Sequence, residues 1–220
     1  MATFSASHLF SAIESREDFI LLDVRNEDAF NQFKVEGPND IEMLNIPYFD
    51  FIEDAEGSAA LVPDGKPVLI VCAKVGSSEY VADVLTELGR EDVSHLEGGI
   101  VSWGNVLVPK RVNDDLDGYE VWQFNRPGKA SCSYGVIYEG EMLIFDPSRN
   151  TEFYLSFAED RGATITHTFE THLQADYISG SPKIAELTGA TFVAHSSDFD
   201  YSVYDYHRLI DGEEIDFSSS

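Results

Sequence analysis

A short apolar run that ends in a cysteine constrains the fold of this chain most strongly. The run extends from Val68 to Val71, Cys72 follows it, and after a tight loop a helix is expected from Tyr80 to Leu88. This order is typical of a buried parallel strand in an α/β sheet. The loop places the Cys72 sulfur beside inward-pointing backbone N–H groups and the positive end of a helix dipole. Both features favour the thiolate, which is the nucleophilic form of cysteine.

The rest of the first half alternates in the same way. Strands are expected at 19–24 and 93–96, and helices are expected at 7–15, 27–33, 49–54 and 100–106. Short apolar strands that alternate with helices predict an α/β domain with a parallel sheet. We therefore predict a first domain at residues 1–108.

The second half has a different pattern, with more strands than helices. Strands are expected at 119–124, 133–138, 142–145, 165–170 and 191–194, with helices at 151–161 and 181–188. Glu139-Gly140-Glu141 predicts a hairpin turn. The segment 109–118 is polar and is expected to be a linker. A second domain is therefore predicted at residues 119–220.

The charge balance limits the possible partners. The 220 residues include 40 acidic and 14 basic residues, which gives a net charge of −26. Such a surface repels nucleic acid and anionic membranes, so neither is expected as a partner. The acids are spread along the chain and lysines are few, which indicates a haloarchaeal cytoplasm at very high salt, where screening weakens self-repulsion. A general solubility device is the alternative.

Cysteine usage and the absence of targeting segments indicate a soluble, cytoplasmic protein. Cys72 and Cys132 lie in different halves and do not form a disulfide framework. The N-terminus lacks the basic start and apolar core of a secretory signal. No apolar stretch is long enough to cross a bilayer.

Four segments of the first half resemble the rhodanese family, in the family's order. They are Leu22-Asp23-Val24-Arg25, Asn45-Ile46-Pro47, the Cys72 loop, and Leu96-Glu97-Gly98-Gly99 followed by Trp103. The resemblance covers about residues 1–108. It implies sulfane-sulfur transfer, in which Cys72 takes sulfur from a small-molecule donor, carries it as a persulfide and passes it to a thiol or to cyanide. No cofactor is implied for this domain.

The resemblance makes Cys72 the expected catalytic residue and assigns substrate binding to the loop residues Ala73, Lys74, Val75, Gly76, Ser77 and Ser78. Lys74 is the only cation of the loop, and it is expected to attract an anionic donor because Ser77 stands where many rhodaneses have a basic residue. Asp23 is expected to bond the backbone near the site, Arg25 to be structural and Glu97 to brace the loop.

Two other interpretations of Cys72 are weaker. Related cysteine phosphatases need an arginine six positions after the cysteine, and the serine at this position, Ser78, cannot clamp a phosphate in a bidentate way. A cysteine after an apolar strand is also often only a small buried hydrophobic residue. The four family segments favour catalysis over both.

A histidine segment in the second half resembles the Thr-His-x-His-x-Asp-His signature of the metallo-β-lactamase fold, especially its persulfide dioxygenase and glyoxalase branch. The segment is Thr171-His172-Leu173-Gln174-Ala175-Asp176-Tyr177. The resemblance covers about residues 119–217 and implies a partial αββα domain. Gln174 and Tyr177 replace the second and third histidines. A dinuclear zinc centre needs about four ligands for each zinc, so zinc hydrolysis is not expected.

The resemblance is compatible with a different metal. Persulfide dioxygenases hold one iron with the first histidine of the signature and with a histidine and an aspartate far downstream. His172 matches the first histidine and is the candidate metal ligand, so Fe(II) is the implied cofactor. No turn around His195 or His207 resembles the second ligand site, and His167 and His195 are expected to be structural. A partner polypeptide or self-association would have to complete this domain.

Three hypotheses for the function follow. The first is a sulfurtransferase fused to a portion of a persulfide-oxidising domain of the dioxygenase type, acting on a small-molecule sulfur donor and a thiol acceptor. The second is a non-catalytic sulfur carrier or interaction protein with a degenerate metal domain. The third is a metallo-hydrolase of the glyoxalase type, which the missing imidazoles disfavour.

Overall fold

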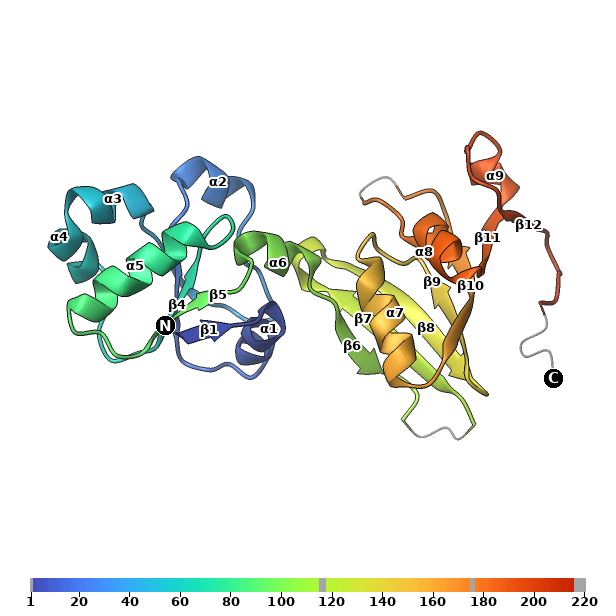
Figure 1. Ribbon diagram of the computed structural model, residues 1–220, viewed down its shortest axis with the longest axis horizontal. Coiled ribbons are helices and arrows are strands. Elements are labelled where there is room, and N and C mark those ends of the chain that lie inside the picture. Colours follow the sequence, from blue (N-terminus) through green and yellow to red (C-terminus); the bar gives the residue numbers. More distant parts are fainter. Residues whose placement is uncertain (1, 115–117, 175–176, 216–220) are drawn as a thin grey trace. The chain divides into compact units, whose positions relative to one another are not determined.

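The computed structural model describes residues 2–114, 118–174 and 177–215, and the chain divides into two compact units (Figure 1). One unit contains Met1–Val106 and Arg126–Ala130, and the other contains Leu107–Asn125 and Ser131–Ser220. Each unit has its own sheet and its own apolar core.

The first unit is built on five parallel strands in the order β1-β5-β4-β2-β3. The inner strands β2 and β4 are buried along their whole length, which explains their continuous apolar sequence. The edge strands β1 and β3 are not among the predicted strands, because short edge strands have little apolar pattern. The strands are β1 (Ala2–Phe4), β2 (Ile20–Asp23), β3 (Glu42–Asn45), β4 (Val68–Val71) and β5 (Val93–Leu96).

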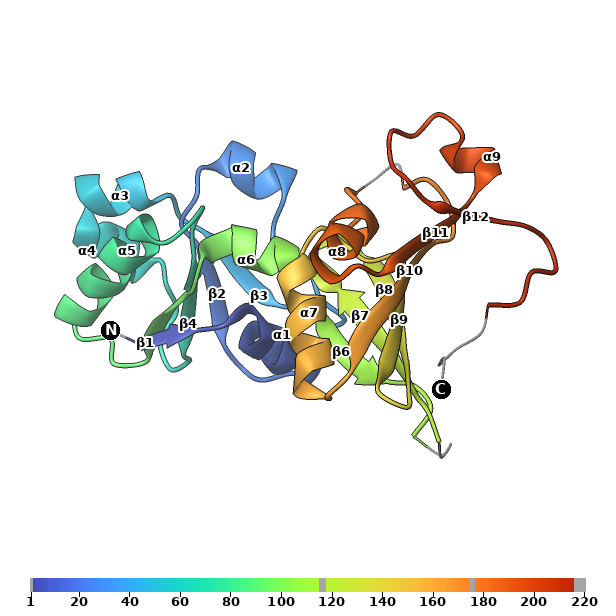
Figure 2. The ribbon, with the colours of Figure 1, turned by 45° about the vertical axis from the view of Figure 1, so that its right-hand side comes forward.

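Helices cover both faces of this sheet (Figures 1 and 2). Helices α1 and α6 pack on one face and α3 and α5 on the other. Ser5, Asn26 and Asp54 cap α1, α2 and α4, each accepting a hydrogen bond from a first-turn N–H. The helices are α1 (Ala6–Glu14), α2 (Glu27–Gln32), α3 (Tyr48–Glu53), α4 (Ala55–Ala60), α5 (Gly76–Glu87) and α6 (Gly99–Asn105).

Helix α5 begins at Gly76, four residues before the predicted start at Tyr80. The sequence Gly76-Ser77-Ser78 has no apolar periodicity, so the pattern does not reveal this first turn. The earlier start shortens the loop after Cys72 and brings the helix N-terminus closer to the cysteine.

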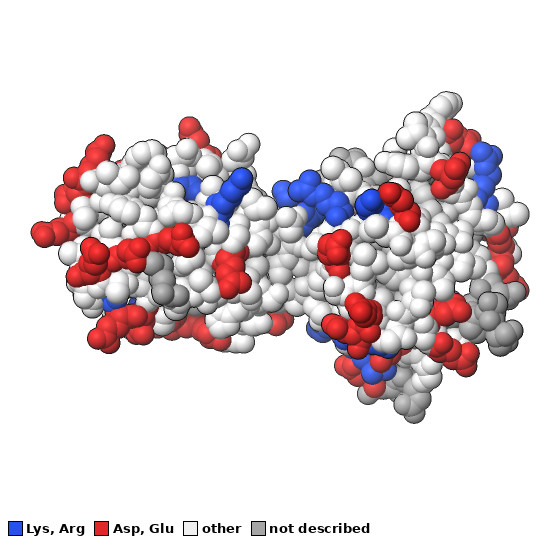
Figure 3. All heavy atoms as spheres, in the orientation of Figure 1, with Lys and Arg blue, Asp and Glu red and all other residues white. Residues whose placement is uncertain are grey.

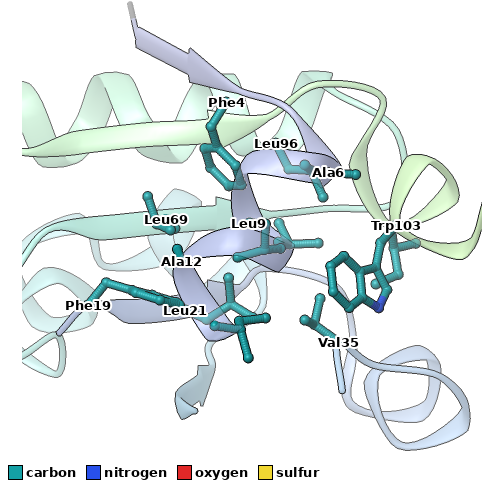
Figure 4. Packing of buried hydrophobic residues seen from close by; sticks show 13 residues of the cluster. Phe4, Ala6, Leu9, Ala12, Phe19, Leu21, Val35, Leu69, Leu96 and Trp103 are labelled. Atoms are coloured by element: carbon teal, nitrogen blue, oxygen red, sulfur yellow. The ribbon is translucent and has the colours of Figure 1, made fainter. Parts of the chain in front are cut away.

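Alternate residues of the strands point into two apolar clusters. Figure 4 shows Leu9 of α1 packed with Leu21 and Leu69 of the sheet and Trp103 of α6. The other cluster joins strand residues to α3 and α5, and Cys72 is one of its members. The core of the first unit therefore fixes the side of the sheet on which the Cys72 sulfur lies.

The second unit is built on a mixed seven-stranded sheet in the order β12-β11-β10-β9-β8-β7-β6. Strands β9 to β12 are parallel to one another, and β8 is antiparallel to β9. The strands are β6 (Val108–Arg111), β7 (Glu120–Arg126), β8 (Ser131–Tyr138), β9 (Glu141–Phe145), β10 (Thr164–Glu170), β11 (Thr191–His195) and β12 (His207–Leu209). Short β12 is not among the predicted strands.

The predicted hairpin turn between β8 and β9 is confirmed. Its central residues Glu139 and Gly140 have φ angles of 47° and 81°. Positive φ at both central positions is the geometry of a type I′ turn, which matches the twist of the paired strands.

The second unit has a core on one face of its sheet. Helices α7 and α8 lie on this face (Figures 1 and 2). Phe124, Met142 and Tyr154 are fully buried there, and Phe124 meets Tyr154 edge to face. The remaining elements are the 3₁₀-helix η1 (Pro127–Lys129), α7 (Thr151–Asp160), α8 (Ser181–Thr188) and α9 (Ser196–Phe199). The predicted α/β class is confirmed in both units.

The linker that we predict at 109–118 is wrong over its first residues. Strand β6 occupies Val108–Arg111 and pairs antiparallel with β7. It lies at the edge of the sheet, where Pro109 and the charged residues Lys110 and Arg111 are tolerated and give the segment a linker-like composition. Residues 115–117 lie outside the described residues.

The acidic residues are dispersed over the surface. On the face in Figure 3, Asp and Glu side chains lie over both units and form no single acidic tail. Among the described residues, no helix combines the length and apolar character needed to span a membrane.

Candidate functional site

Cys72 follows directly after β4. Its side chain is 2% exposed and belongs to the apolar cluster on the α5 side of the sheet. Only residues 73–75 separate it from the first residue of α5, Gly76. This arrangement confirms the predicted strand, loop and helix around the cysteine.

The backbone of the Cys72 loop presents N–H groups that could bind an anion. Within the described part of the chain, the N–H groups of residues 73–77 have no hydrogen-bond acceptor. By contrast, the N–H groups of Ser78 and Glu79 both donate to the Val75 carbonyl oxygen, at 3.0 and 3.2 Å. Free N–H groups beside the positive end of a helix favour a negatively charged group.

The side chains of the loop differ in exposure. Ala73, Lys74 and Gly76 are exposed, and Val75 and Ser77 are half-buried. Lys74 makes no ion pair among the described residues, so its ammonium group is available to an incoming anion. The predicted role of these five residues in substrate binding stays a prediction.

Ser78 differs from the rest of the loop. Its side chain is fully buried, and its Oγ lies 3.1 Å from the Cys72 Sγ. The same Oγ donates to the Val75 carbonyl oxygen at 2.7 Å. The Ser78 side chain therefore contacts the cysteine itself, and its role in substrate binding stays a prediction.

Gly99 supports the loop from the neighbouring strand connection. The Ile100 N–H donates to the Cys72 carbonyl oxygen at 2.8 Å. Gly99 has a φ of +60°, and a Cβ there would lie 2.5 Å from the Lys74 carbonyl oxygen and 2.6 Å from the Cys72 carbonyl oxygen. Only glycine fits this position, which explains the second glycine of Leu96-Glu97-Gly98-Gly99.

A buried ion pair holds the end of β2. Arg25 Nη2 lies 2.6 Å from Asp23 Oδ2, and the Arg25 guanidinium also donates to the Phe33 carbonyl oxygen at 2.6 Å. Asp23 Oδ1 accepts the Arg25 backbone N–H at 3.0 Å, so the predicted backbone bond of Asp23 is confirmed. Asn45 donates to the carbonyl oxygens of Asp23 and Arg25, a role that the sequence did not reveal.

Glu97 bonds the edge strand β1, whereas the predicted partner is the cysteine loop. Its carboxylate accepts the hydroxyl of Thr3 at 2.6 Å, and its backbone N–H donates to the Phe4 carbonyl oxygen. These bonds fix the edge strand β1. The prediction that the Glu97 side chain braces the cysteine loop is therefore corrected.

In the second unit, the histidine segment begins directly after β10. His172 is exposed, and its Nδ1 lies 2.9 Å from the Thr171 Oγ. Ala175 and Asp176 of the predicted signature lie outside the described residues. Among the residues described, His172 is the imidazole that the signature places in this segment.

Gln174 takes part in a network of neutral donors around two carboxylates. Its Nε2 donates to Asp146 Oδ1 at 3.0 Å and lies 3.4 Å from Glu170 Oε2. Thr171 donates to Asp146 through its N–H at 2.8 Å and its hydroxyl at 2.7 Å. The Tyr177 hydroxyl donates to the Asp146 carbonyl oxygen at 3.0 Å.

Glu170 is buried at the end of β10 and accepts hydrogen bonds from the hydroxyls of Ser179 and Ser181. Burial raises the pKa of its carboxyl group above the ordinary value, and the two serine hydroxyls partly oppose this rise. The carboxylate is thus satisfied by hydroxyl and amide donors of its own segment.

The residues of the second unit do not fit the iron that the resemblance implies. Among the described residues, no group of three or more His, Cys, Asp or Glu side chains could hold a metal ion. The Gln174 amide, a hydrogen-bond donor, lies between Asp146 and Glu170, so it competes with a cation for their oxygens.

The other histidines of this unit have structural surroundings. His195 Nδ1 accepts the Ser197 N–H at 3.1 Å and so caps α9, as a structural role predicts. His167 lies within β10, where its ring stacks near Phe169 and burial lowers its pKa. His207 Nε2 lies 2.6 Å from Glu213 Oε1.

Comparison with known proteins identifies the first unit. The profile of the rhodanese-like domain matches residues 6–105. A thiosulfate sulfurtransferase GlpE from Tolumonas auensis is 30% identical over 86 residues, which are 39% of this chain and 73% of that protein. The GlpE of Pseudoalteromonas translucida is 27% identical over 88 residues, which are 40% of this chain and 75% of that protein.

Solved structures add matches of low overall similarity. A metallo-beta-lactamase from Staphylococcus aureus subsp. aureus COL has a TM-score of 0.43 and 28% identity, with 45% of this chain and 30% of that chain covered. ETHE1 from Myxococcus xanthus has a TM-score of 0.35 and 19% identity, with 51% of this chain and 44% of that chain covered. The profile match and the GlpE relatives show that this chain belongs to the rhodanese-like family through residues 6–105.

Proposed function

We propose that this chain transfers sulfane sulfur through a persulfide on Cys72. The observation that carries the proposal is the cysteine sulfur at the end of β4, beside a loop whose N–H groups at residues 73–77 have no acceptor in the described structure. The thiosulfate sulfurtransferases among the relatives support this reaction class.

In the first half-reaction, the Cys72 thiolate attacks the outer sulfur of an anionic donor such as thiosulfate. A bond forms between Sγ and that sulfur, the sulfur–sulfur bond of the donor breaks, and the electron pair leaves with sulfite. The thiol proton has already passed to solvent, so the single negative charge of the thiolate reappears on the terminal sulfur of the persulfide. The free N–H groups of the loop and the N-terminus of α5 would stabilise that charge.

In the second half-reaction, the thiolate of an acceptor attacks the terminal sulfur of the persulfide. A new sulfur–sulfur bond forms on the acceptor, and the bond to Sγ breaks. Its electron pair returns to Cys72 as the thiolate. No cofactor is needed for either half-reaction.

Lys74 is proposed to draw the anionic donor to the loop. The chain has a net charge of −26, which repels a donor such as thiosulfate at low ionic strength. Lys74 is exposed in the loop and offers a local positive charge. We also propose that the protein works in a cytoplasm of high salt, where the long-range repulsion is screened.

The second unit is proposed to be a metallo-β-lactamase-like domain whose metal site has become a hydrogen-bonded cluster. Gln174 and Tyr177 at two signature positions support this, because both bond Asp146. This observation also favours the second candidate function, a sulfur carrier or interaction protein that delivers a single sulfur without turnover.

The decisive experiment follows sulfur on Cys72. The purified chain is incubated with thiosulfate in low and in molar KCl, and the Cys72 peptide is analysed by mass spectrometry for the addition of one sulfur atom. Sulfite release in the presence of a thiol or cyanide measures turnover. We expect a persulfide on Cys72 and many turnovers for each chain.

Two variants serve as test and control. Cys72→Ser should abolish sulfite release, and Cys132→Ser, at the exposed second cysteine, should leave it unchanged. A Cys72→Ser protein that still releases sulfite would refute the proposal. Persulfide formation that stops after one equivalent would favour the sulfur carrier instead.

A further inference from the structure

Ser78 carries one proton but has two potential acceptors. Its Oγ lies 3.1 Å from the Cys72 Sγ and 2.7 Å from the Val75 carbonyl oxygen. A hydroxyl donates only one hydrogen bond at a time. When Cys72 is a thiol, the S–H can donate to Ser78 Oγ while the Ser78 hydroxyl donates to Val75. When Cys72 is a thiolate, it has no proton to donate, so Ser78 can bond the sulfur only as the donor.

The apolar surroundings of Cys72 increase the stabilisation that a hydrogen bond from Ser78 gives to the thiolate. The sulfur lies among apolar side chains of β4 and α5, and Cys72 is 2% exposed. An anion in such a place costs free energy unless a donor compensates it. Among the described residues, Ser78 Oγ is the side-chain group within hydrogen-bond distance of Sγ.

The Ser78 hydroxyl can leave the Val75 carbonyl oxygen at a small cost in free energy. This carbonyl oxygen also accepts the backbone N–H groups of Ser78 and Glu79, at 3.0 and 3.2 Å. The carbonyl therefore stays bonded when the Ser78 hydroxyl turns to the sulfur. A buried polar group that keeps a partner avoids the penalty of an unsatisfied one.

We propose that Ser78 stabilises the Cys72 thiolate by donating a hydrogen bond from its hydroxyl to Sγ. To do so, the hydroxyl gives up its hydrogen bond to the Val75 carbonyl oxygen. This inference rests on the proposed function for its use in catalysis, since the thiolate is the attacking group. It assigns a hydroxyl to the position where a cysteine phosphatase has arginine. A hydroxyl supports one charge on the cysteine sulfur and offers no bidentate clamp to a phosphate.

The charged groups near this end of the sheet do not replace Ser78. Lys74 and Glu79 lie on the loop and on α5, the Asp23–Arg25 pair lies at the end of β2, and Glu97 follows β5. His95 of β5 is buried. None of them has a hydrogen bond or ion pair to Cys72 within the described residues.

The test compares Ser78→Ala with Thr86→Ala, a matched loss of one hydroxyl on the same helix and outside the cysteine loop. The Thr86 hydroxyl donates to the Ala82 carbonyl oxygen at 2.7 Å, as the Ser78 hydroxyl donates to Val75. All variants have the Cys132→Ser background, so that Cys72 is the single thiol. The readouts are the rate of alkylation by iodoacetamide and the ultraviolet absorbance of the thiolate, each measured against pH.

We expect Ser78→Ala to slow alkylation about tenfold or more at neutral pH, because a hydrogen bond to a charged group is lost. The alkylation rates of Ser78→Ala and of the parent should become equal at alkaline pH, where the thiol ionises without the Ser78 hydrogen bond. The thiolate absorbance should appear at a higher pH than in the parent. Thr86→Ala should match the parent in both readouts.

Two outcomes would overturn the inference. One is wild-type alkylation and absorbance curves for Ser78→Ala. The other is a deficit of equal size at every pH, which would indicate altered access. Ser78→Thr keeps the hydroxyl and should retain most of the reactivity, which keeps the test valid if the alanine variant unfolds. Alkylation needs no sulfur donor, so a chain that fails to transfer sulfur would refute the proposed function without deciding the role of Ser78.

Discussion

The cysteine loop of the first unit and the histidine segment of the second unit both follow a parallel strand, but they treat charge in opposite ways. Around Cys72, five N–H groups have no acceptor in the described structure. Around Asp146 and Glu170, the carboxylate oxygens accept hydrogen bonds from Thr171, Gln174 and two serine hydroxyls. The first region has unused donors for an anion. The second has already satisfied the groups that would attract a cation.

Under the proposed function, this difference separates a site that is prepared for a reaction from one that stabilises a fold. Unused donors cost free energy in the folded state and are worth keeping where a ligand will use them. A satisfied network strengthens the fold, and the neutral donor amide of Gln174 lies where a metal would have to displace it. We expect variants of the two regions to differ in whether they change reactivity or stability.

The largest loss of stability is expected from Asp23→Ala in the first unit. The change leaves the Arg25 guanidinium buried without its carboxylate, and removing one partner of a buried ion pair costs about 3–5 kcal/mol. Thermal or urea unfolding measures this loss. Asp146→Ala is the matched control in the second unit, because its lost partners are neutral donors, and it should cost about 1–2 kcal/mol. Equal losses for both variants would contradict the comparison.

Gly99→Ala should cause the second largest effect, and it should act on sulfur transfer as well as stability. The added Cβ would overlap the carbonyl oxygens of Cys72 and Lys74 and would adopt a positive φ. We expect a loss of about 2–4 kcal/mol and a transfer rate reduced at least tenfold, since the loop must move. Sulfite release and urea unfolding measure the two effects.

Gly89→Ala separates the backbone strain of a positive φ from the contact of an added Cβ with the cysteine loop. Gly89 also has a positive φ, of +95°, but a Cβ there would meet nothing within 4 Å. This variant should lose only about 1 kcal/mol and should transfer sulfur at the normal rate. A Gly99→Ala protein that behaves like Gly89→Ala would show that the contact with the loop is unimportant.

The sequence reveals Cys72 more readily than its surroundings because an apolar strand before a cysteine is a local pattern. The bond from Ser78 to Sγ depends on α5 starting at Gly76, and no apolar periodicity marks that start. The need for glycine at residue 99 arises from backbone atoms of a different strand connection. These contacts join residues that are separated along the chain, so the local pattern does not contain them.

In the histidine segment too, the local sequence does not predict contacts with distant residues. The sequence indicates correctly that Gln174 and Tyr177 are poor replacements for zinc ligands. It does not show what they do instead, because Asp146 is 28 positions from Gln174 in the chain. The positive φ of Asp146, 52°, is also invisible in the sequence, although it helps place the carboxylate opposite Thr171.

Gln174→Leu is expected to destabilise the second unit without affecting Cys72. The leucine removes the amide donor shared by Asp146 and Glu170, which should cost about 1–2 kcal/mol. The fluorescence of Trp122 follows unfolding of this unit if Trp103 of the first unit is replaced by Phe. Gln123→Leu is the control, because Gln123 donates to an exposed tyrosine hydroxyl and should lose less. A slower sulfur transfer in Gln174→Leu would contradict the separation of the two regions.

A smaller effect is expected in the pH dependence of Glu170. Burial raises its folded-state pKa, so the folded protein binds this proton more tightly than the unfolded chain. The stability that Glu170 contributes is therefore present below the unfolded pKa and is lost as pH rises through the folded pKa. Glu170→Gln does not titrate at this position. The melting temperature of the wild-type protein minus that of Glu170→Gln should therefore increase as pH falls from neutral toward 4. A difference that is constant with pH would contradict the raised pKa.

The smallest change is expected from removal of metal. Wild-type protein that is exposed to Fe(II) or Zn(II) and then desalted should retain far less than one metal ion per chain, and a chelator should not shift its melting temperature. His172→Ala should leave both results unchanged, because its exposed imidazole bonds only the neighbouring Thr171 among the described residues. Stoichiometric metal that is lost on His172→Ala would show that the oxygens of Asp146 and Glu170 prefer a cation to the Gln174 amide. In that case, the second unit would have an open site like that of the first.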